Sequence, residues 1–465
     1  MSWIETIVDG LNNVLWTYIL IALLIGAGLY FTISTRFVQF RLFGEMFRLI
    51  TEKKEDKSGV SPFQAFTIST ASRVGTGNIT GVALAIGIGG PGAVFWMWVI
   101  AIIGMATAFI ESTLAQVYKV RDGDSFRGGP AYYIEKALGS RKLGIVFSIL
   151  LILCFGFIFN AVQSNTIAAS VGDVFNIPPY IIGIVLVLLT AIIIFGGVHR
   201  IVSVTQIVVP VMAVFYLAIT LFVVITNISE IPAVFKLIIT HAFGLEEAVG
   251  GTIGAAIMQG VRRGLFSNEA GMGSVPNAAA TASVSHPAKQ GLVQSLGVFF
   301  DTIIICSATA FIIILAGLYS TGEDDGVILT QNSLAVHVGE WAPYFVAIAI
   351  IFFAYSSVMG NYYYGETNIE FMNAGKGWLT AYRFLVLGMV MFGSLAHVQL
   401  VWTLADLFMG LMATMNIVVI ILLGKVAFKV LDDFTRQRKK GQDPTFYAKT
   451  IPGLKNTECW EEEDR

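Results

Sequence analysis

The sequence predicts an all-α polytopic membrane protein with about 11 transmembrane helices. Of its 465 residues, 55% are hydrophobic and only 13% are charged, which is roughly half the charged fraction of a soluble domain. The 47 glycines agree with this class, because glycine is more frequent in membrane helices than in soluble ones. The formal net charge of −2 leaves no basic surplus for nucleic acid. A disordered chain and a disulfide scaffold are excluded, and a soluble enzyme is disfavoured.

Eleven apolar runs, each near the length of about 20 residues that crosses a bilayer, account for most of the chain. They fall at residues 14–34, 62–88, 92–118, 143–169, 179–197, 203–226, 248–275, 288–317, 342–365, 377–394 and 398–424. The first is expected to be a membrane helix and not a signal peptide. Glu5 and Asp9 precede it where a signal peptide is basic, and no small-residue cleavage site follows.

The positive charges predict the orientation, because Lys and Arg concentrate in cytoplasmic loops. With the N-terminus outside, 25 of the 29 Lys and Arg residues fall on the inner side. The other four are Lys236 on an outer loop and Arg73, Arg262 and Arg263 within apolar runs. We therefore expect the N-terminus outside and the C-terminus in the cytoplasm. In the inner loop 119–142, Pro130 predicts the start of a short surface helix, and the polar tail after Lys425 is expected to be solvated.

Two runs are interrupted by glycine and polar residues at membrane depth. The run 62–88 contains Ser69–Gly81 (STASRVGTGNITG), and the run 248–275 carries glycines from Gly250 to Gly273 together with Arg, Asn and Glu. Each glycine costs about 1 kcal/mol of helix propensity, so both segments favour local unwinding. Unwound backbone in a bilayer is tolerated where it is buried in protein or lines a cavity. There its N–H groups can bind a carboxylate and its carbonyls a small cation.

The positions of these two runs predict an inverted repeat. With the first helix set aside, the remaining ten runs form two groups of five, each opened by an interrupted helix and running in opposite directions. The predicted units are an extra helix at 1–34, a basic cytoplasmic loop at 35–61, a first repeat at 62–226, an extracellular loop at 227–247, a second repeat at 248–424 and a cytoplasmic tail at 425–465. Paired broken helices point to a transporter with a midplane site; close packing through small residues is the alternative.

Other chemistry finds little support in the sequence. Cys154, Cys306 and Cys459 are far apart, and the five histidines show no metal-ligand spacing. The motif GxxxxGK[ST] of nucleotide-driven pumps is absent from the sequence. We therefore expect that the protein is not an enzyme and has no cofactor. Its expected surroundings are the lipid bilayer, and we expect neither a nucleic-acid partner nor an obligate protein partner.

Four motifs resemble the bacterial and archaeal alanine/glycine:cation symporter family. They are Arg73–Asn78 (RVGTGN), Gly128–Tyr133 (GGPAYY), Phe266–Gly273 (FSNEAGMG) and Asn361–Glu366 (NYYYGE). The resemblance implies a LeuT-like fold with one extra helix before a five-plus-five inverted repeat, in a bacterial plasma membrane. It also implies import of alanine or glycine, with glutamine as a further candidate, coupled to sodium. Proton coupling and a transporter-like amino-acid receptor are the alternatives.

The same resemblance implies that Thr76, Gly77 and Asn78 bind the substrate carboxylate. Gln163 is polar within the fourth run, where its amide could contact either end of an amino acid or bond another helix. The candidate walls of the pocket are Phe266, Ser267, Asn268, Met359 and Tyr363, for which ordinary packing is the alternative.

For the sodium ion, the resemblance implies hydroxyls from Ser356 and Ser357 and carbonyls from Ala71 and Val74. The alternative for the serines is a bond to their own helix. Coupling or gating is expected of the ionisable residues Arg73, Arg262, Arg263, Glu269, Asp301 and Glu366. Asp301 and Glu269 could each hold a cation or a proton, or could neutralise one of the arginines. Arg262 and Arg263 are expected in the inner half of their span, and Glu111 at a solvated inner end.

Overall fold

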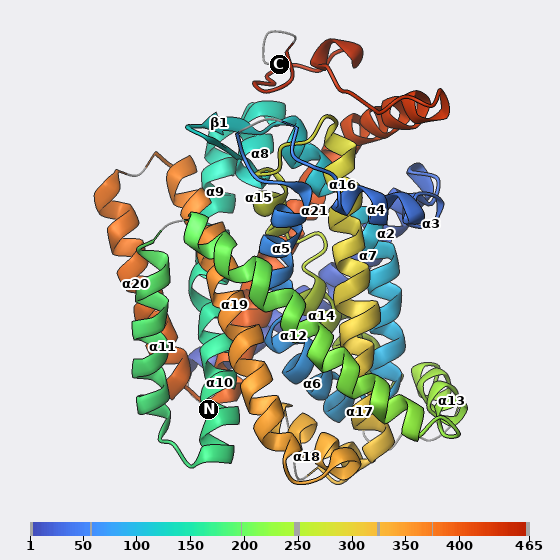
Figure 1. Ribbon diagram of the computed structural model, residues 1–465, viewed down its shortest axis with the longest axis vertical. Coiled ribbons are helices and arrows are strands. Elements are labelled where there is room, and N and C mark those ends of the chain that lie inside the picture. The colour runs from blue at the N-terminus through green and yellow to red at the C-terminus, as the bar shows by residue number, and fades with distance from the viewer. Residues whose placement is uncertain are drawn as a thin grey trace.

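The computed structural model describes residues 3–55, 58–196, 198–245, 252–322, 326–373 and 375–461. The described residues form a bundle of helices that run mostly along one axis, with the two ends of the chain at opposite ends of the molecule (Figure 1). We call these ends the N-terminal face and the C-terminal face. The fold is that of an all-helical polytopic membrane protein, and its single sheet among the described residues is one short hairpin.

The elements before residue 140 are α1 (Trp3–Val14), η1 (Leu15–Leu20), α2 (Ile21–Ser34), α3 (Val38–Arg41), α4 (Phe43–Ile50), α5 (Pro62–Arg73), η2 (Gly77–Gly81), α6 (Val82–Gly89), α7 (Gly92–Val117), β1 (Val120–Asp122), β2 (Ser125–Arg127) and α8 (Pro130–Leu138). The middle of the chain forms α9 (Arg141–Leu151), η3 (Ile152–Phe159), α10 (Asn160–Phe175), α11 (Pro179–Ile194), α12 (Val198–Thr226) and α13 (Ile231–Ala242). The rest forms α14 (Ile253–Asn268), α15 (Val275–Ala279), α16 (Pro287–Val298), η4 (Phe299–Cys306), α17 (Ser307–Ala316), η5 (Leu318–Ser320), α18 (Gly326–Val338), α19 (Ala342–Phe371), α20 (Lys376–Leu395), α21 (Val398–Lys439) and η6 (Ala448–Thr450).

The number of unbroken helices that could cross a membrane is smaller than the predicted 11. Within the described residues, seven helices are long and apolar enough to cross a membrane, and a pair bent by 102°, Pro210–Thr226 with Ile231–Ala242, makes an eighth. The runs 62–88 and 248–275 fall short because both are interrupted. The run 179–197 forms α11, which has 16 residues. Gly250 and Gly251 of the predicted second interruption lie outside the described residues.

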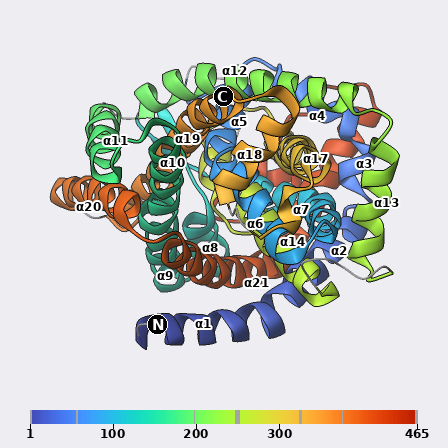
Figure 2. The ribbon, with the colours of Figure 1, turned by 90° about the horizontal axis from the view of Figure 1, so that it is seen from below.

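Glycines of α14 let this helix pack closely against α7. A Cβ at Gly260 of α14 would lie 2.5 Å from the carbonyl oxygen of Ala93, and one at Gly264 would lie 2.6 Å from the Ile100 side chain. Both glycines are inside a regular helix, so close packing and not unwinding explains them. Seen from the N-terminal face, α12 runs along one edge of the bundle, and α1 lies on the opposite edge beside α21 (Figure 2).

The C-terminal face carries the connecting structure. The hairpin β1–β2 pairs antiparallel, and α8 begins at Pro130 as predicted. The tail after α21 is not a solvated extension, which corrects the prediction. Phe446, Ala448, Ile451 and Trp460 are buried in the hydrophobic core, so the tail folds back onto the protein.

Candidate functional site

The helix of the second apolar run stops at Val74, whose backbone is extended (φ −80°, ψ 91°). The N–H of Gly75 donates to Oδ1 of Asn78 at 2.9 Å, and not to the Ala71 carbonyl four residues earlier. Helical structure then resumes with the π-helical turn η2 at Gly77. The side chain of Asn78 therefore stabilises the break and leaves the Ala71 carbonyl available to another partner.

That partner is Ser357 of α19. Its Oγ lies 2.9 Å from the Ala71 carbonyl oxygen and 3.5 Å from that of Val74. Both serine hydroxyls approach the Phe353 carbonyl of their own helix, Ser356 at 2.8 Å and Ser357 at 3.1 Å. Among the described residues, Ser357 alone of the two also bonds the carbonyls at the break. Of the predicted sodium ligands, the structure thus brings together Ala71, Val74 and Ser357 and turns Ser356 to its own helix.

A second polar cluster surrounds the carboxylate of Asp301, which lies in η4 and is fully buried. Asn78 donates from Nδ2 to Oδ1 at 2.7 Å, and Ser267 donates to Oδ2 at 2.8 Å. Thr302 donates to the same Oδ2 at 2.8 Å. Within the described residues, these donors are all neutral, so the carboxylate meets three hydrogen bonds and no positive side chain in direct contact. None of the three arginines is in contact with it, because Arg73 bonds the Asn268 carbonyl and Arg262 and Arg263 pair with Asp406.

The predicted substrate residues also meet around the first break. Gln163 of α10 accepts the Thr76 N–H through Oε1 at 3.1 Å, so this side chain contacts the broken backbone across the bundle. The buried polar atoms that have no hydrogen-bond partner among the described residues include Thr76 Oγ1, Asn268 Nδ2 and Asn361 Nδ2. Because a buried polar atom without a partner is costly, such atoms are candidates to bind a ligand.

Aromatic rings close the site towards the N-terminal face. The ring of Phe266 lies 4.5 Å from that of Phe159 and 4.7 Å from that of Trp402, centre to centre. A Cβ at Gly77 would lie 3.0 Å from the Phe266 ring, so glycine allows this close approach. Met359 is fully buried in the hydrophobic core. Tyr363, four residues further along α19, lines a cavity of ≈ 290 Å³ on the other side, together with Arg127 and Glu366.

The second interruption begins where α14 ends at Asn268. Glu269 is left-handed (φ +58°), and Gly271 and Gly273 also have positive φ. The two glycine N–H groups point to Glu111 of α7, donating to Oε1 and Oε2 at 3.1 Å each. Asn416 donates to Oε2 at 2.9 Å. The prediction of a solvated Glu111 was wrong, because this fully buried carboxylate binds the freed backbone of the break.

Two of the predicted coupling residues link the broken helices to each other. Arg73, at the end of α5, donates from Nε to the Asn268 carbonyl at 2.9 Å. Glu269 accepts from the Ser72 hydroxyl at 2.6 Å and from that of Ser274 at 2.6 Å. Each interruption is therefore held by contacts with the other.

Arg262 and Arg263 lie in the C-terminal half of α14 and face α1. They line a cavity of ≈ 270 Å³ together with Asp9 and Asn12 of α1. They were expected in the inner half of their span; in the structure they stand six and five residues before the end of α14 at Asn268, beside α1 and the start of α21. Nη2 of Arg263 donates to both carboxylate oxygens of Asp406 in α21, to Oδ1 at 2.8 Å and to Oδ2 at 2.6 Å. Nη1 of Arg262 lies 3.3 Å from Oδ2 of the same carboxylate.

Glu366 is nearly buried on α19 and lies towards the opposite face. It accepts from the Tyr362 hydroxyl at 3.1 Å and lies 3.4 Å from Nη2 of Arg383. The next acid on the same helix face, Glu370, forms an ion pair with Arg127 of the hairpin. Ion pairs therefore connect α19 to α20 and to β2 near the C-terminal face.

Sequence reasoning missed Asp406 and Asn416 of α21 and gave Glu111 the wrong surroundings. Asp406 carried the same signal as Asp301, an acid within an apolar run. Asn416 had a weaker signal, since a single amide in a long apolar helix can simply bond a neighbouring helix.

Comparison with known proteins identifies a family over nearly the whole chain. Residues 1–448 match the sodium:alanine symporter family. The chain is 60% identical to the amino-acid carrier protein AlsT of Bacillus subtilis, over 99% of both chains. It is 53% identical to the probable sodium/glutamine symporter GlnT of the same organism, over 98% of this chain and 96% of that one.

More distant relatives extend the comparison. The sodium/alanine symporter AgcS of Methanococcus maripaludis is 39% identical, over 93% of this chain and 98% of that one. Among solved structures, MhsT in complex with L-phenylalanine matches with a TM-score of 0.52 at 13% identity, covering 82% of this chain and 90% of that chain. At this identity the structural match shows a shared fold.

Proposed function

This chain belongs to the sodium:alanine symporter family, and on that premise we propose that it imports a small neutral amino acid together with sodium. The family consists of cation-coupled amino-acid carriers, so the protein is a carrier and not an enzyme. Its relatives are named for alanine in one case and for glutamine in another. Alanine or glycine is the proposed substrate of this chain, and glutamine is the second candidate.

One observation carries the proposal: the Ser357 hydroxyl faces the Ala71 carbonyl that the break in the helix leaves unpaired. Oxygens of unwound backbone and nearby hydroxyls suit a dehydrated cation at the midplane. We assign sodium to Ala71, Val74 and Ser357. The resemblance also implied Ser356, whose hydroxyl would have to leave its bond to Phe353 to take part.

The substrate is proposed to bind between the two breaks. The carboxylate would take hydrogen bonds from the backbone and side chains at Thr76, Gly77 and Asn78, and Gln163 would hold that backbone in place. Ser267 and Asn268 would face the substrate from the second break. Phe266 would limit the side chain of the substrate on one side, and Met359 and Tyr363 on the other, which favours a small amino acid.

The surroundings of Asp301 support the alternative of coupling to protons. Its buried carboxylate accepts three hydrogen bonds from neutral groups, and a cation or a proton would compensate its charge there. We propose that Asp301 takes part in ion coupling through its contacts with Asn78 and Ser267. Coupling of this kind requires that ion and substrate each raise the affinity for the other.

Alternating access is proposed to open the site to each face in turn, with the N-terminal face outside the cell in the plasma membrane. The Arg263–Asp406 pair and the Phe266–Trp402 contact would then form the outer closure. The ion pairs of Glu366 and Glu370 would belong to the inner closure. The two groups of five helices are proposed to act as inverted repeats, each contributing one interrupted helix to the site.

The test is uptake of labelled alanine, glycine and glutamine into proteoliposomes, with sodium and proton gradients imposed separately. Sodium-driven accumulation that requires about tenfold more sodium in Ser357→Ala and is unchanged in Ser356→Ala supports the proposed ion and site together. Accumulation driven by protons alone, and lost in Asp301→Asn, would move the coupling role to Asp301. Binding without accumulation under either gradient would leave a receptor as the function.

A further inference from the structure

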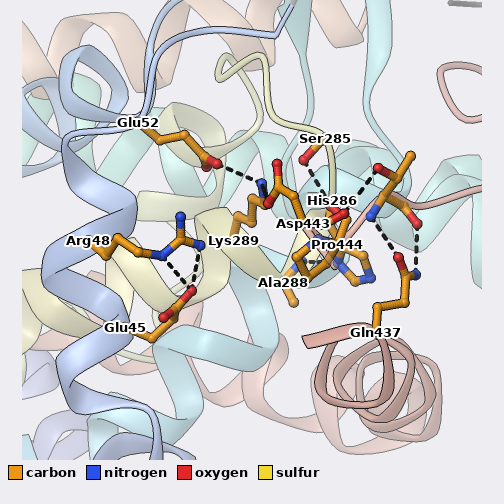
Figure 3. Close-up of polar contacts among 11 residues, drawn as sticks. Glu45, Arg48, Glu52, Ser285, His286, Ala288, Lys289, Gln437, Asp443 and Pro444 are labelled. Carbon is orange, nitrogen blue, oxygen red and sulfur yellow. Dashed lines mark hydrogen bonds and ion pairs between the residues drawn. The ribbon is translucent and has the colours of Figure 1, made fainter. Parts of the chain in front are cut away.

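The segment that follows α21 folds back over the C-terminal face and pairs with the chain there. The turn at Gly441 has a positive φ (+76°) and reverses the chain direction. The side chain of Gln437 then bonds both backbone groups of Thr445, at 2.8 Å and 2.9 Å. The Phe446 N–H donates to the Ser285 carbonyl at 2.9 Å. The Ser285 hydroxyl donates to the Pro444 carbonyl at 2.9 Å (Figure 3).

The pairing continues to the entrance of the broken helix α5. The Val60 N–H donates to the Thr281 carbonyl at 3.1 Å, and the Ser283 N–H donates to the Val60 carbonyl at 2.9 Å. Three extended stretches, around Val60, Thr281–Ser285 and Pro444–Phe446, therefore lie side by side. We call them the seam. Val60 is two residues before α5 and Ser285 is two residues before α16, so the seam joins the entrances of two membrane helices to the tail.

A buried charge reinforces the seam. The Lys289 side chain is 2% exposed, and its Nζ lies 2.7 Å from Glu52 and 2.8 Å from Asp443 (Figure 3). Lys289 is in the first turn of α16, Glu52 follows α4, and Asp443 belongs to the tail. A nearly buried ammonium group with two carboxylate partners becomes costly when either partner leaves, so this contact favours the seated tail.

The far end of the tail is anchored separately. Trp460 is buried, donates from Nε1 to the Gln116 carbonyl of α7 at 2.8 Å, and packs its ring 5.4 Å from that of Phe446. Asn456 donates to the Lys136 carbonyl of α8 at 2.8 Å, and the Lys136 side chain forms an ion pair with Glu458. The tail therefore spans from α16 to α7 and α8.

We propose that residues 443–460 form a latch that holds the C-terminal face closed and must leave its seat before the substrate site can open to that face. Opening has to separate α5 from its neighbours at the face where the seam joins them. The seated tail bonds one of the other two stretches of the seam directly and also bonds α7 and α8. The latch therefore adds its bonds to the closed state, and its release permits opening. The inference rests on the transport proposed above.

A reversible tether tests the latch. In a Cys459→Ser background, Lys136→Cys and Glu458→Cys place thiols on α8 and the tail where the native side chains form an ion pair. Oxidation should lower sodium-driven alanine uptake at least tenfold while alanine binding persists, and reduction should restore uptake. Thr450→Cys with Lys455→Cys, two exposed tail positions, is the matched control, whose oxidation ties the tail only to itself and should change uptake less than twofold.

Uptake that is unaffected by the Lys136–Glu458 tether would overturn the latch. Absence of uptake in the reduced carrier would instead count against the proposed function, so the two failures are distinguishable. Hydrogen–deuterium exchange of residues 281–286 gives a second measurement that needs no transport. Exchange should rise at least threefold in Trp460→Ala and stay unchanged in Lys455→Ala; equal exchange in both would also overturn the proposal.

Discussion

The hydroxyl of Ser357 lies 2.9 Å from the carbonyl oxygen of Ala71, a residue 286 positions earlier in the chain. The contact joins α19 to the point where α5 ends. The carbonyl is available because the Gly75 N–H, its partner in an unbroken helix, bonds Asn78 instead. The local break and the long-range contact thus depend on the same backbone geometry.

Replacing Ser357 by Ala should raise the sodium concentration needed for half-maximal uptake about tenfold. Loss of one coordinating oxygen would account for about 1.4 kcal/mol of binding free energy, which is tenfold in affinity. Ser356→Ala is the matched control and should change this concentration less than twofold, because that hydroxyl bonds its own helix. The measurement is the sodium dependence of alanine uptake; equal shifts in the two variants would contradict the assignment.

Replacing Gly75 or Gly81 by alanine should reduce uptake to very different extents. A Cβ at Gly75 would lie 2.2 Å from Ser357 Oγ and 2.9 Å from Gln163 Oε1, whereas at Gly81 the nearest atom would be 3.8 Å away. We expect Gly75→Ala to lose more than nine-tenths of uptake and Gly81→Ala to keep at least half. Uptake is measured per amount of folded carrier. Full uptake by Gly75→Ala would show that transport does not need the close approach of Ser357 and Gln163 to Gly75.

Glu111→Gln should destabilise the protein. The carboxylate accepts two backbone N–H groups and the Asn416 amide, and a glutamine has a single acceptor oxygen for these donors. Each buried donor left unpaired costs about 1–3 kcal/mol, so the thermal unfolding temperature in detergent should fall by several degrees. The neighbouring Ser112→Ala removes a buried hydroxyl that has no partner among the described residues and should leave that temperature within about a degree.

Asp406→Asn should also lower stability, because it leaves Arg263 buried without its charge partner. Breaking a buried ion pair from one side typically costs about 3–5 kcal/mol. Adding Arg263→Met to Asp406→Asn should recover part of the lost unfolding temperature. A double variant that is less stable than Asp406→Asn alone would show that Arg263 is stabilised by groups other than Asp406.

The sequence was most informative where chemistry is unusual for a membrane. Clustered glycines beside Asn78 and Asn268 indicated both interruptions, and the structure interrupts the first helix at Val74, shortly before Asn78, and the second after Asn268. The same signal misled at Gly260 and Gly264, because a glycine that lets α7 approach closely looks the same in sequence as one that ends a helix. Arg262 and Arg263 therefore belong to a regular helix and not to an unwound segment.

Partners across the fold could not be predicted, because they depend on packing between distant helices. Glu111 meets Gly271 only after α7 and the second break are placed side by side, and Arg263 meets Asp406 in the same way. The tail illustrates a different limit. Trp460 stands in a polar, charged stretch with no apolar periodicity, so composition indicated a solvated segment although one aromatic anchor and Lys289 hold it in place.

The stack of Phe159, Phe266 and Trp402 seals one side of the site with hydrocarbon surface. Separating these rings would expose apolar area to water, and such exposure raises the heat capacity. Access from that side should therefore have an activation enthalpy that changes with temperature, seen as a curved Arrhenius plot for substrate entry. The ring contacts themselves are insensitive to ionic strength, so an effect of salt on this closure would come from the neighbouring Arg263–Asp406 pair.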